Sequence, residues 1–499
     1  MRAGGGRRKT GFPCDHNLVI EANSKTALNR LWRVLTVVAA LPVALPAGEW
    51  SQFRGPNASG VSNETGILDD FGPAKNVIWK TALPPGHSSP SIGDDRIFVT
   101  GYENKKIWVF CLDRSTGRIL WRREVPRPRE EALHKSNSPT SPTPATDGKN
   151  AFVFLTDFGM MSFGPDGNER WRLPLGPFNN PMGMASSPIL AGDTVLQVCD
   201  QESGSYFLAV DKNTGKVKWR VERPEFSRGF STPLLYQPPN GALQVLVTGS
   251  YRLTAYEVET GKAVWWVGKL TWQLKPTPVM NKDRIYILGW AGESDTGQQE
   301  DIPPFEEVLK KWDTDRDGKL SSSEIPDKKI TKDWDAVDLD RTGLLEERDW
   351  RLYQSRRASQ NAVNAFRLGG HGDMTGENFL WNYTKSLPNV PSPLYYQDVL
   401  YILKEGGILT SLNPENGEVW KQARLAGAPG LYFTSPVAAD GKIFTISAEG
   451  KLSVIKPGRE WDVVRVIDLG EETHATPAIA GGRIYVRTHG TLYCFGKTI

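Results

Sequence analysis

Two short features each recur eight times along this chain, and that recurrence limits the fold more than any other property. The first is a Ser-Pro or Thr-Pro step directly before a short β-rich run, as in SSPSIGDDRIFVTG and TSPVAADGKIFTI. The prolines of these steps are Pro90, Pro144, Pro188, Pro233, Pro278, Pro393, Pro436 and Pro477. Most steps are roughly 45 residues apart, an interval typical of propellers and other repeat architectures.

The second feature is a tryptophan late in each unit, often after a D-x-x-T-G or N-G turn, as in LDRSTGRILW and LNPENGEVW. This series consists of Trp79, Trp121, Trp171, Trp219, Trp265, Trp381, Trp420 and Trp461. Each unit reads as four short strands, with Pro opening the first strand and a turn joining the third and fourth. The sequence therefore predicts an all-β fold, an eight-bladed β-propeller of four-stranded antiparallel blades, with tryptophans packed between blades.

Trp79 lies before the first Pro step, whereas the last unit stops after three strands at TLYCF. We therefore expect residues 76–82 to supply the fourth strand of the last blade and to close the ring, since an open sheet edge invites aggregation.

The repeats LDRSTGRILW and VDKNTGKVKW resemble those of the pyrroloquinoline-quinone (PQQ) type β-propellers, and EWSQFRGPNASGVS resembles the segment that opens many secreted members of that group. The resemblance covers residues 49–499 apart from one insertion. It implies the propeller fold, but it leaves activity open, because the group contains both quinoprotein alcohol dehydrogenases and a periplasmic lipoprotein that assists outer-membrane protein assembly.

About 70 extra residues, 292–361, interrupt the fifth unit between its second and third strands, which predicts a helical insertion over one mouth of the channel. Within it, DTDRDGKLSSSE matches the calcium-loop pattern D-x-D-x-D-G-x5-E of an EF-hand in full. The expected ligands are Asp313, Asp315, Asp317, the Lys319 carbonyl, Ser321 and Glu324.

A partner loop follows at DLDRTGLLEERD, with Asp338, Asp340, Thr342, the Leu344 carbonyl, Glu346 and Asp349 at the matching positions. Thr342 replaces an acid and Asp349 is shorter than Glu, so this loop is expected to bind calcium more weakly, or to bind a smaller ion. The domain organisation is then an extension and signal peptide (1–48), blades 1–4 with the start of blade 5 (49–291), the EF-hand pair (292–361) and the remaining blades (362–499).

Residues just before the inner strands are expected to ring the channel mouth. The candidates for holding a ligand are His87, Trp272, Lys275, Tyr432 and His474, and Asn137, Met184 and Phe230 occupy similar positions. The resemblance implies that a quinone enzyme would carry an adjacent Cys-Cys pair, and this sequence has none. We therefore expect calcium but no PQQ, and a binding or scaffolding module; the alternative is a PQQ-dependent dehydrogenase of alcohols or sugars. The Ser residues beside the prolines read as turn formers.

Arg30 and Arg33 precede an apolar run from Val34 to about Ala47, which is typical of a secretory signal and short for a membrane span. We expect an exported, periplasmic or extracellular monomer with no transmembrane span in its mature form and a protein or cell-envelope partner. The 60 basic and 57 acidic side chains nearly balance, which argues against nucleic acid as a partner.

Overall fold

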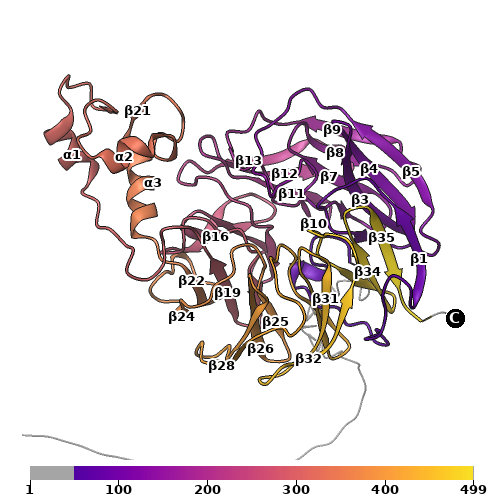
Figure 1. Ribbon diagram of the computed structural model, residues 1–499. Coiled ribbons are helices and arrows are strands. Elements are labelled where there is room, and N and C mark those ends of the chain that lie inside the picture. Colours follow the sequence, from indigo (N-terminus) through magenta and orange to yellow (C-terminus); the bar gives the residue numbers. More distant parts are fainter. Residues whose placement is uncertain (1–49, 498–499) are drawn as a thin grey trace, which may run out of the picture. The chain divides into compact units, whose positions relative to one another are not determined.

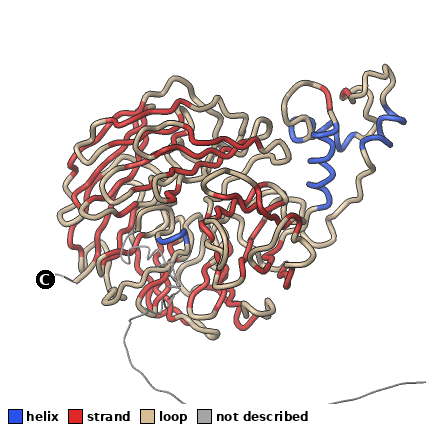
Figure 2. Tube along the Cα trace, turned by 180° about the vertical axis from the view of Figure 1, so that it is seen from behind, coloured by secondary structure: helices blue, strands red, loops and turns tan. Residues whose placement is uncertain are grey.

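The computed structural model describes residues 50–497. The predicted all-β fold is confirmed: the strands form eight four-stranded antiparallel sheets arranged as a propeller (Figures 1 and 2). The expected signal peptide lies outside the described residues.

Sheets one to four follow one another along the chain. Their strands are β2 (Ser91–Ile92), β3 (Arg96–Glu103), β4 (Lys106–Asp113) and β5 (Ile119–Val125); β6 (Ala145–Thr146), β7 (Ala151–Leu155), β8 (Gly159–Phe163) and β9 (Glu169–Pro174); β10 (Ile189–Ala191), β11 (Thr194–Cys199), β12 (Tyr206–Asp211) and β13 (Val217–Glu222); and β14 (Leu234–Tyr236), β15 (Gln244–Gly249), β16 (Arg252–Glu257) and β17 (Ala263–Val267).

Sheets five to eight contain the insertion and the ring closure. Their strands are β18 (Val279–Met280), β19 (Arg284–Gly289), β22 (Ala362–Arg367) and β24 (Phe379–Tyr383); β25 (Leu394–Tyr396), β26 (Val399–Lys404), β27 (Ile408–Leu412) and β28 (Val419–Arg424); β29 (Val437–Ala439), β30 (Lys442–Ile446), β31 (Lys451–Lys456) and β32 (Asp462–Asp468); and β33 (Ala478–Ala480), β34 (Arg483–Arg487), β35 (Thr491–Phe495) and β1 (Val77–Ala82).

Burial follows the position of a strand within its sheet. The second strand β7 is buried along its whole length, whereas the outer strand β13 alternates between exposed and half-buried residues. Inner strands are covered on both faces by neighbouring sheets, so they read as continuous apolar runs, while outer strands meet water on one face. The hydrophobic core is accordingly divided into clusters between sheets, such as the one that joins Phe98 of the first sheet to Phe163 of the second.

The first strand in the chain completes the last sheet. β1 pairs antiparallel with β35, with Trp79 opposite Cys494 and Lys80 opposite Tyr493. The three described cysteines, Cys111, Cys199 and Cys494, are free and buried.

Most of the recurring tryptophans link neighbouring sheets in the same way. The indole N–H of Trp121 donates to the Pro165 carbonyl, in the turn before the outer strand of the next sheet, at 3.0 Å. The same contact is made by Trp79, Trp171, Trp219 and Trp381 at 2.8–3.1 Å. Trp265 differs, because its indole N–H donates to the side-chain oxygen of Gln244 within the same sheet. The outer strand of this sheet, β17, pairs with β23 (Gly372–Asp373), a short strand from the fifth unit.

The segment from residue 50 to 62 crosses the ring and bonds to four inner strands. The Trp50 and Ser51 carbonyls accept hydrogen bonds from sheets one and two, Asn57 exchanges two with Leu235 of sheet four, and Ser62 donates to Ala438 of sheet seven. Its short helix η1 (Pro56–Ala58) is the helical element within the ring of strands in Figure 2.

The insertion between β19 and β22 is helical and has its own core. It contains α1 (Phe305–Trp312), β20 (Leu320–Ser321), α2 (Lys328–Lys332), η2 (Trp334–Ala336), β21 (Leu344–Leu345) and α3 (Glu347–Ala358). Its apolar cluster, which includes Phe305, Val308, Ile330 and Trp350, is separate from those of the blades. Within residues 50–497, no helix is long and apolar enough to cross a membrane.

Candidate functional site

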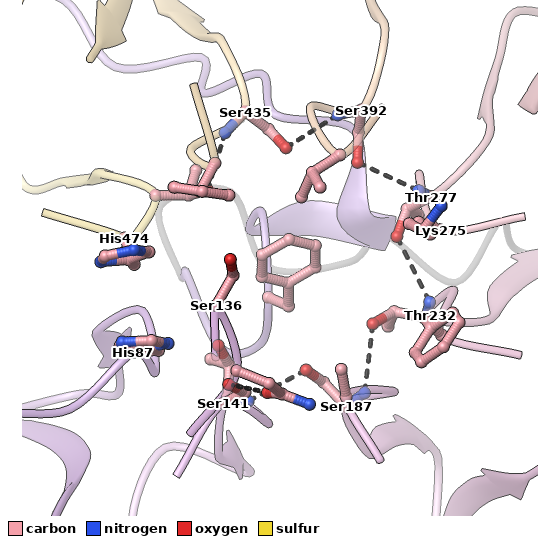
Figure 3. Close-up of a pocket in the computed structure, with 18 of the residues that line it drawn as sticks. His87, Ser136, Ser141, Ser187, Thr232, Lys275, Thr277, Ser392, Ser435 and His474 are labelled. Atoms are coloured by element: carbon pink, nitrogen blue, oxygen red, sulfur yellow. Dashed lines mark hydrogen bonds between the residues drawn. The ribbon is translucent and has the colours of Figure 1, made fainter. Parts of the chain in front are cut away.

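A closed ring of hydrogen bonds encircles the channel where the eight inner strands begin. In each sheet, the backbone N–H of the Ser or Thr before the repeat proline donates to the side-chain hydroxyl of its counterpart in the next sheet, at 2.9–3.3 Å. Figure 3 shows the part of this ring from Ser435 through Ser392, Thr277 and Thr232 to Ser187. We call these eight residues the collar: Ser89, Thr143, Ser187, Thr232, Thr277, Ser392, Ser435 and Thr476. The collar therefore links each blade to the next by a hydrogen bond.

All eight collar residues line a cavity of about 400 Å³ at the channel mouth. Each collar hydroxyl accepts one backbone N–H, and within the described chain none of them donates to a protein acceptor. Their O–H groups are therefore available to a ligand or to water. Phe53, from the segment that crosses the ring, also lines this cavity.

An aromatic stack forms one wall of the cavity. The rings of His87 and His474 are nearly parallel, with centroids 4.2 Å apart, and Phe433 stacks on His474 at 4.7 Å (Figure 3). Burial, reinforced by the neighbouring His474, lowers the pKa of His87 to about 3, so this imidazole is neutral near pH 7. Among the described residues, the only group of three or more His, Cys, Asp or Glu side chains close enough to share a metal ion lies in the insertion.

Lys275 places an ammonium group in the wall of the cavity. Its Nζ donates to the Trp290 carbonyl at 3.1 Å and lies 5.6 Å from the centroid of that indole ring. Burial lowers the pKa of Lys275 to about 7, and the nearby Arg228 acts in the same direction. None of the residues that line the cavity is an Asp or a Glu.

The structure brings some of the mouth candidates together and separates others. His87, Lys275 and His474 line the cavity, as do Asn137 and Phe230. Trp272 and Tyr432 do not line it.

Trp272 instead lies under the guanidinium groups of Arg228 and Arg356, and the Tyr432 hydroxyl donates to the Ala428 carbonyl inside the core. Their neighbours Gln273 and Phe433 face the cavity, because successive side chains of an extended segment point in opposite directions. Met184 is likewise buried, in the core between sheets two and three.

The first acidic loop of the insertion gathers its carboxylates. One carboxylate oxygen from each of Asp313, Asp315 and Asp317 lies within 4.8 Å of the other two. Gly318 has the positive φ of 82° that the sharp turn requires, and its N–H donates to Asp313. Glu324 folds back, and hydrogen bonds from the Ser321 and Thr314 backbones hold its pKa down at about 2.

The second acidic loop has the same backbone geometry and is paired with the first. Gly343 also has a φ of 82°, and its N–H donates to Asp338 at 2.8 Å. Leu320 of β20 pairs with Leu345 of β21, which are equivalent positions of the two loops.

The second loop and α3 dock on the ring. Arg348 donates to the carbonyls of Pro224 and Glu202 at 2.9 and 2.6 Å, and the Leu339 carbonyl accepts from Asn179 at 2.8 Å. No described residue of the insertion lines the channel cavity. These contacts are with loops of the ring, and they anchor the insertion at its rim.

The family to which the chain belongs follows from its match to a family model. The model described as outer membrane protein assembly factor BamB matches residues 64–199, 130–329 and 373–498, well over half of the chain. The chain belongs to this family. The BamB-family matches leave out residues 330–372, which include the second acidic loop and α3.

Solved structures share the fold at low sequence identity. BamB from Moraxella catarrhalis is 13% identical with a TM-score of 0.51, and the likeness covers 84% of this chain and 98% of that one. A europium-containing methanol dehydrogenase is 11% identical with a TM-score of 0.58, covering 91% and 99%. No curated protein sequence matches the chain. Since one of these relatives is an assembly factor and the other an enzyme, the fold alone does not decide between binding and catalysis.

Proposed function

We propose that this BamB-family protein is an exported, monomeric binding module of the cell envelope that holds its ligand at the channel mouth and performs no catalysis. Its partner is a protein or another envelope component. The family is described as an outer membrane protein assembly factor, which supports a role in the envelope. The near balance of charge argues against nucleic acid.

The observation that carries this proposal is the absence of carboxylates among the residues that line the cavity. A quinoprotein dehydrogenase needs oxygen ligands for the ion beside its quinone and a carboxylate to act as the base. The lining offers hydroxyl, amide, imidazole and ammonium groups, which do not make such a site. The three described cysteines are also buried, and none of them lines the cavity.

Reconstitution tests the proposal against the dehydrogenase alternative. Purified protein is mixed with PQQ and either calcium or a lanthanide, freed of excess cofactor, and assayed for quinone absorbance and for dye reduction with alcohols and sugars. We expect no alcohol- or sugar-dependent dye reduction. Turnover with any of these substrates would establish the enzyme and refute the binding module.

We further propose that the insertion binds calcium. In the first loop the ligands are Asp313, Asp315, Asp317, the Lys319 carbonyl, Ser321 and Glu324. In the second they are Asp338, Asp340, Thr342, the Leu344 carbonyl, Glu346 and Asp349. The shared glycine geometry and the β20–β21 pairing support an EF-hand pair, and a hard cation would relieve the repulsion among the clustered carboxylates.

Titration calorimetry tests calcium binding at the first loop. Asp313→Ala should abolish the tighter calcium-binding event, because it removes a carboxylate from the cluster, whereas Asp283→Ala, outside the insertion, should bind as the unaltered chain does. If Asp313→Ala binds calcium with unchanged affinity and stoichiometry, the first loop is not the site.

A further inference from the structure

Three basic side chains surround the channel cavity, whose lining contains no carboxylate; Glu405, which accepts from the backbone of the lining residue Asn389, raises the pKa of Lys275 without forming an ion pair with it. Lys275 lies in its wall, and Arg54 and Arg487 are buried behind it, at 0% and 1% exposure. Within residues 50–497, none of the three forms an ion pair. Burying a charge without a counter-charge is costly, so this arrangement requires an explanation.

Arg54 lies just behind the collar. Its Nη2 donates to the carbonyl of Pro393, the residue after collar Ser392, at 2.7 Å. Its Nε and Nη1 are buried with no hydrogen-bond partner in the described structure. Burial lowers the pKa of Arg54 to about 9, which leaves it charged near pH 7.

Arg487 lies behind the histidine wall. Its Nη1 donates to the carbonyl of Ser88 at 3.0 Å and to the Ser88 hydroxyl at 2.8 Å, and Ser88 stands between the lining residues His87 and Ser89. Burial lowers its pKa to about 9, again leaving the guanidinium charged near neutrality. Its charge therefore acts on the cavity through a low-dielectric wall.

Other buried arginines of this chain are paired, which makes these exceptions informative. Arg223 binds Asp200 at 2.7 Å with both side chains fully buried, and Arg228 binds Glu202 at 2.7 Å. The sequence thus supplies counter-charges where arginines serve the packing of blades three and four. Among the residues that line the channel cavity it supplies the Lys275 ammonium and uncharged polar groups, including the eight collar hydroxyls, but no carboxylate.

We propose that the cavity binds a small anion carrying phosphate or carboxylate oxygens, whose negative charge is the missing partner of Lys275, Arg54 and Arg487. Lys275 and collar hydroxyls contact the anion directly, and the two arginines stabilise it from behind the wall. This inference rests on the proposed function, since it names the ligand class of the same site.

The test measures binding of two simple probes, inorganic phosphate and citrate, by calorimetry and by the rise in the thermal unfolding midpoint, at constant ionic strength. A ligand that binds only the folded state raises this midpoint. We expect at least one probe to bind the unaltered chain, while the neutral polyol glycerol at equal concentration does not. Lys275→Met should weaken that binding at least about tenfold, the effect of losing roughly 1.4 kcal/mol of interaction.

Lys421→Met is the matched control. Lys421 also donates to a tryptophan carbonyl, that of Trp461 at 2.7 Å, and lies 4.7 Å from the centroid of its ring, but on the outer strand β28. The Lys421→Met substitution removes the same kinds of local contact at a site away from the cavity, so it should leave anion binding unchanged. Failure of both probes to bind, or equal losses in the two variants, would overturn the proposal.

A second variant supplies the missing charge from the protein. Gln273 is buried in the cavity lining, so Gln273→Glu places a carboxylate there with little change of shape. It should abolish anion binding and raise the midpoint of the ligand-free protein. Unchanged binding together with a lowered midpoint would contradict the account. Substrate-dependent dye reduction in the quinone assay would refute the proposed function. If no dye is reduced and neither phosphate nor citrate binds, only the inference of an anion site is refuted.

Discussion

At the scale of single residues, the contact between a tryptophan and a turn glycine decides how closely two blades approach. Gly167 has a φ of 78°, and a Cβ atom added there would lie 2.7 Å from the Trp121 ring. The repeated D-G, T-G and N-G turns thus combine a left-handed backbone with space for the neighbour's indole. A Cβ atom added at Gly215 would likewise lie too close to the Trp171 ring, and one added at Gly261 too close to the Trp219 ring.

Gly167→Ala should therefore lower the free energy of unfolding by about 2–4 kcal/mol, from backbone strain and overpacking together. Gly441→Ala is the control, because Gly441 has a φ of 66° but an added Cβ would meet nothing within 4 Å, so only about 1 kcal/mol is expected. Urea unfolding monitored by tryptophan fluorescence gives both values. Equal effects would show that the indole contact contributes nothing.

The charge of Lys275 should appear in the pH dependence of stability. Burial, reinforced by Arg228 and opposed by Glu405, lowers its pKa from near 10.5 in the unfolded chain to about 7 in the folded chain. Between these values the unfolded chain binds more protons, so the contribution of Lys275 makes the protein more stable as pH rises.

Lys275→Met should thus stabilise the ligand-free protein by about 1–4 kcal/mol at pH 6, and by less at pH 9. Urea unfolding of both proteins at the two pH values, in buffer without multivalent anions, measures the difference. A stabilisation that grows with pH would contradict the assigned pKa direction.

At the scale of elements, the collar explains why Ser or Thr precedes every repeat proline. Thr232→Val removes the acceptor of the Ser187 N–H and leaves that buried donor unpaired, which costs about 1–3 kcal/mol. Thr232→Ser keeps the hydroxyl and should lose much less. Thermal unfolding compares the two variants, and equal losses would mean that the methyl group matters more than the hydrogen bond.

The number of blades could be predicted from the sequence, whereas the cavity could be predicted only in part. The proline series and the tryptophan series each count units along the chain, so the eight sheets follow from local patterns. The partner of each collar hydroxyl lies in the next blade, and no local pattern distinguishes that role from a turn. The sequence pattern selected Trp272 and Tyr432, whereas their neighbours Gln273 and Phe433 line the cavity. A shift of one residue along an extended segment reverses the direction of the side chain, and the sequence pattern does not fix that direction. Arg54 lies far in sequence from the strands that it contacts.

At the scale of the whole molecule, the beginning and the end of the described chain complete one sheet. Removing residues 1–83 deletes β1 together with the segment that crosses the ring, and exposes the edge of β35. We expect this protein to aggregate on size-exclusion chromatography, because an unpaired strand edge recruits other chains. Removing residues 1–48 alone should leave the described unit folded and eluting at its own size. If both truncated proteins elute as single folded species, β1 is not needed for closure.

The claim that the channel mouth is the binding surface is tested most directly by photo-crosslinking within the cell envelope. Leu431 is 51% exposed on the loop that leads to the cavity residue Phe433, whereas Val217 is 47% exposed on the outer strand β13. A photoreactive residue at position 431 should form a discrete crosslink to an envelope component, and the same residue at position 217 should not. Crosslinks from position 217 alone would place binding on the outside of the ring and contradict the account.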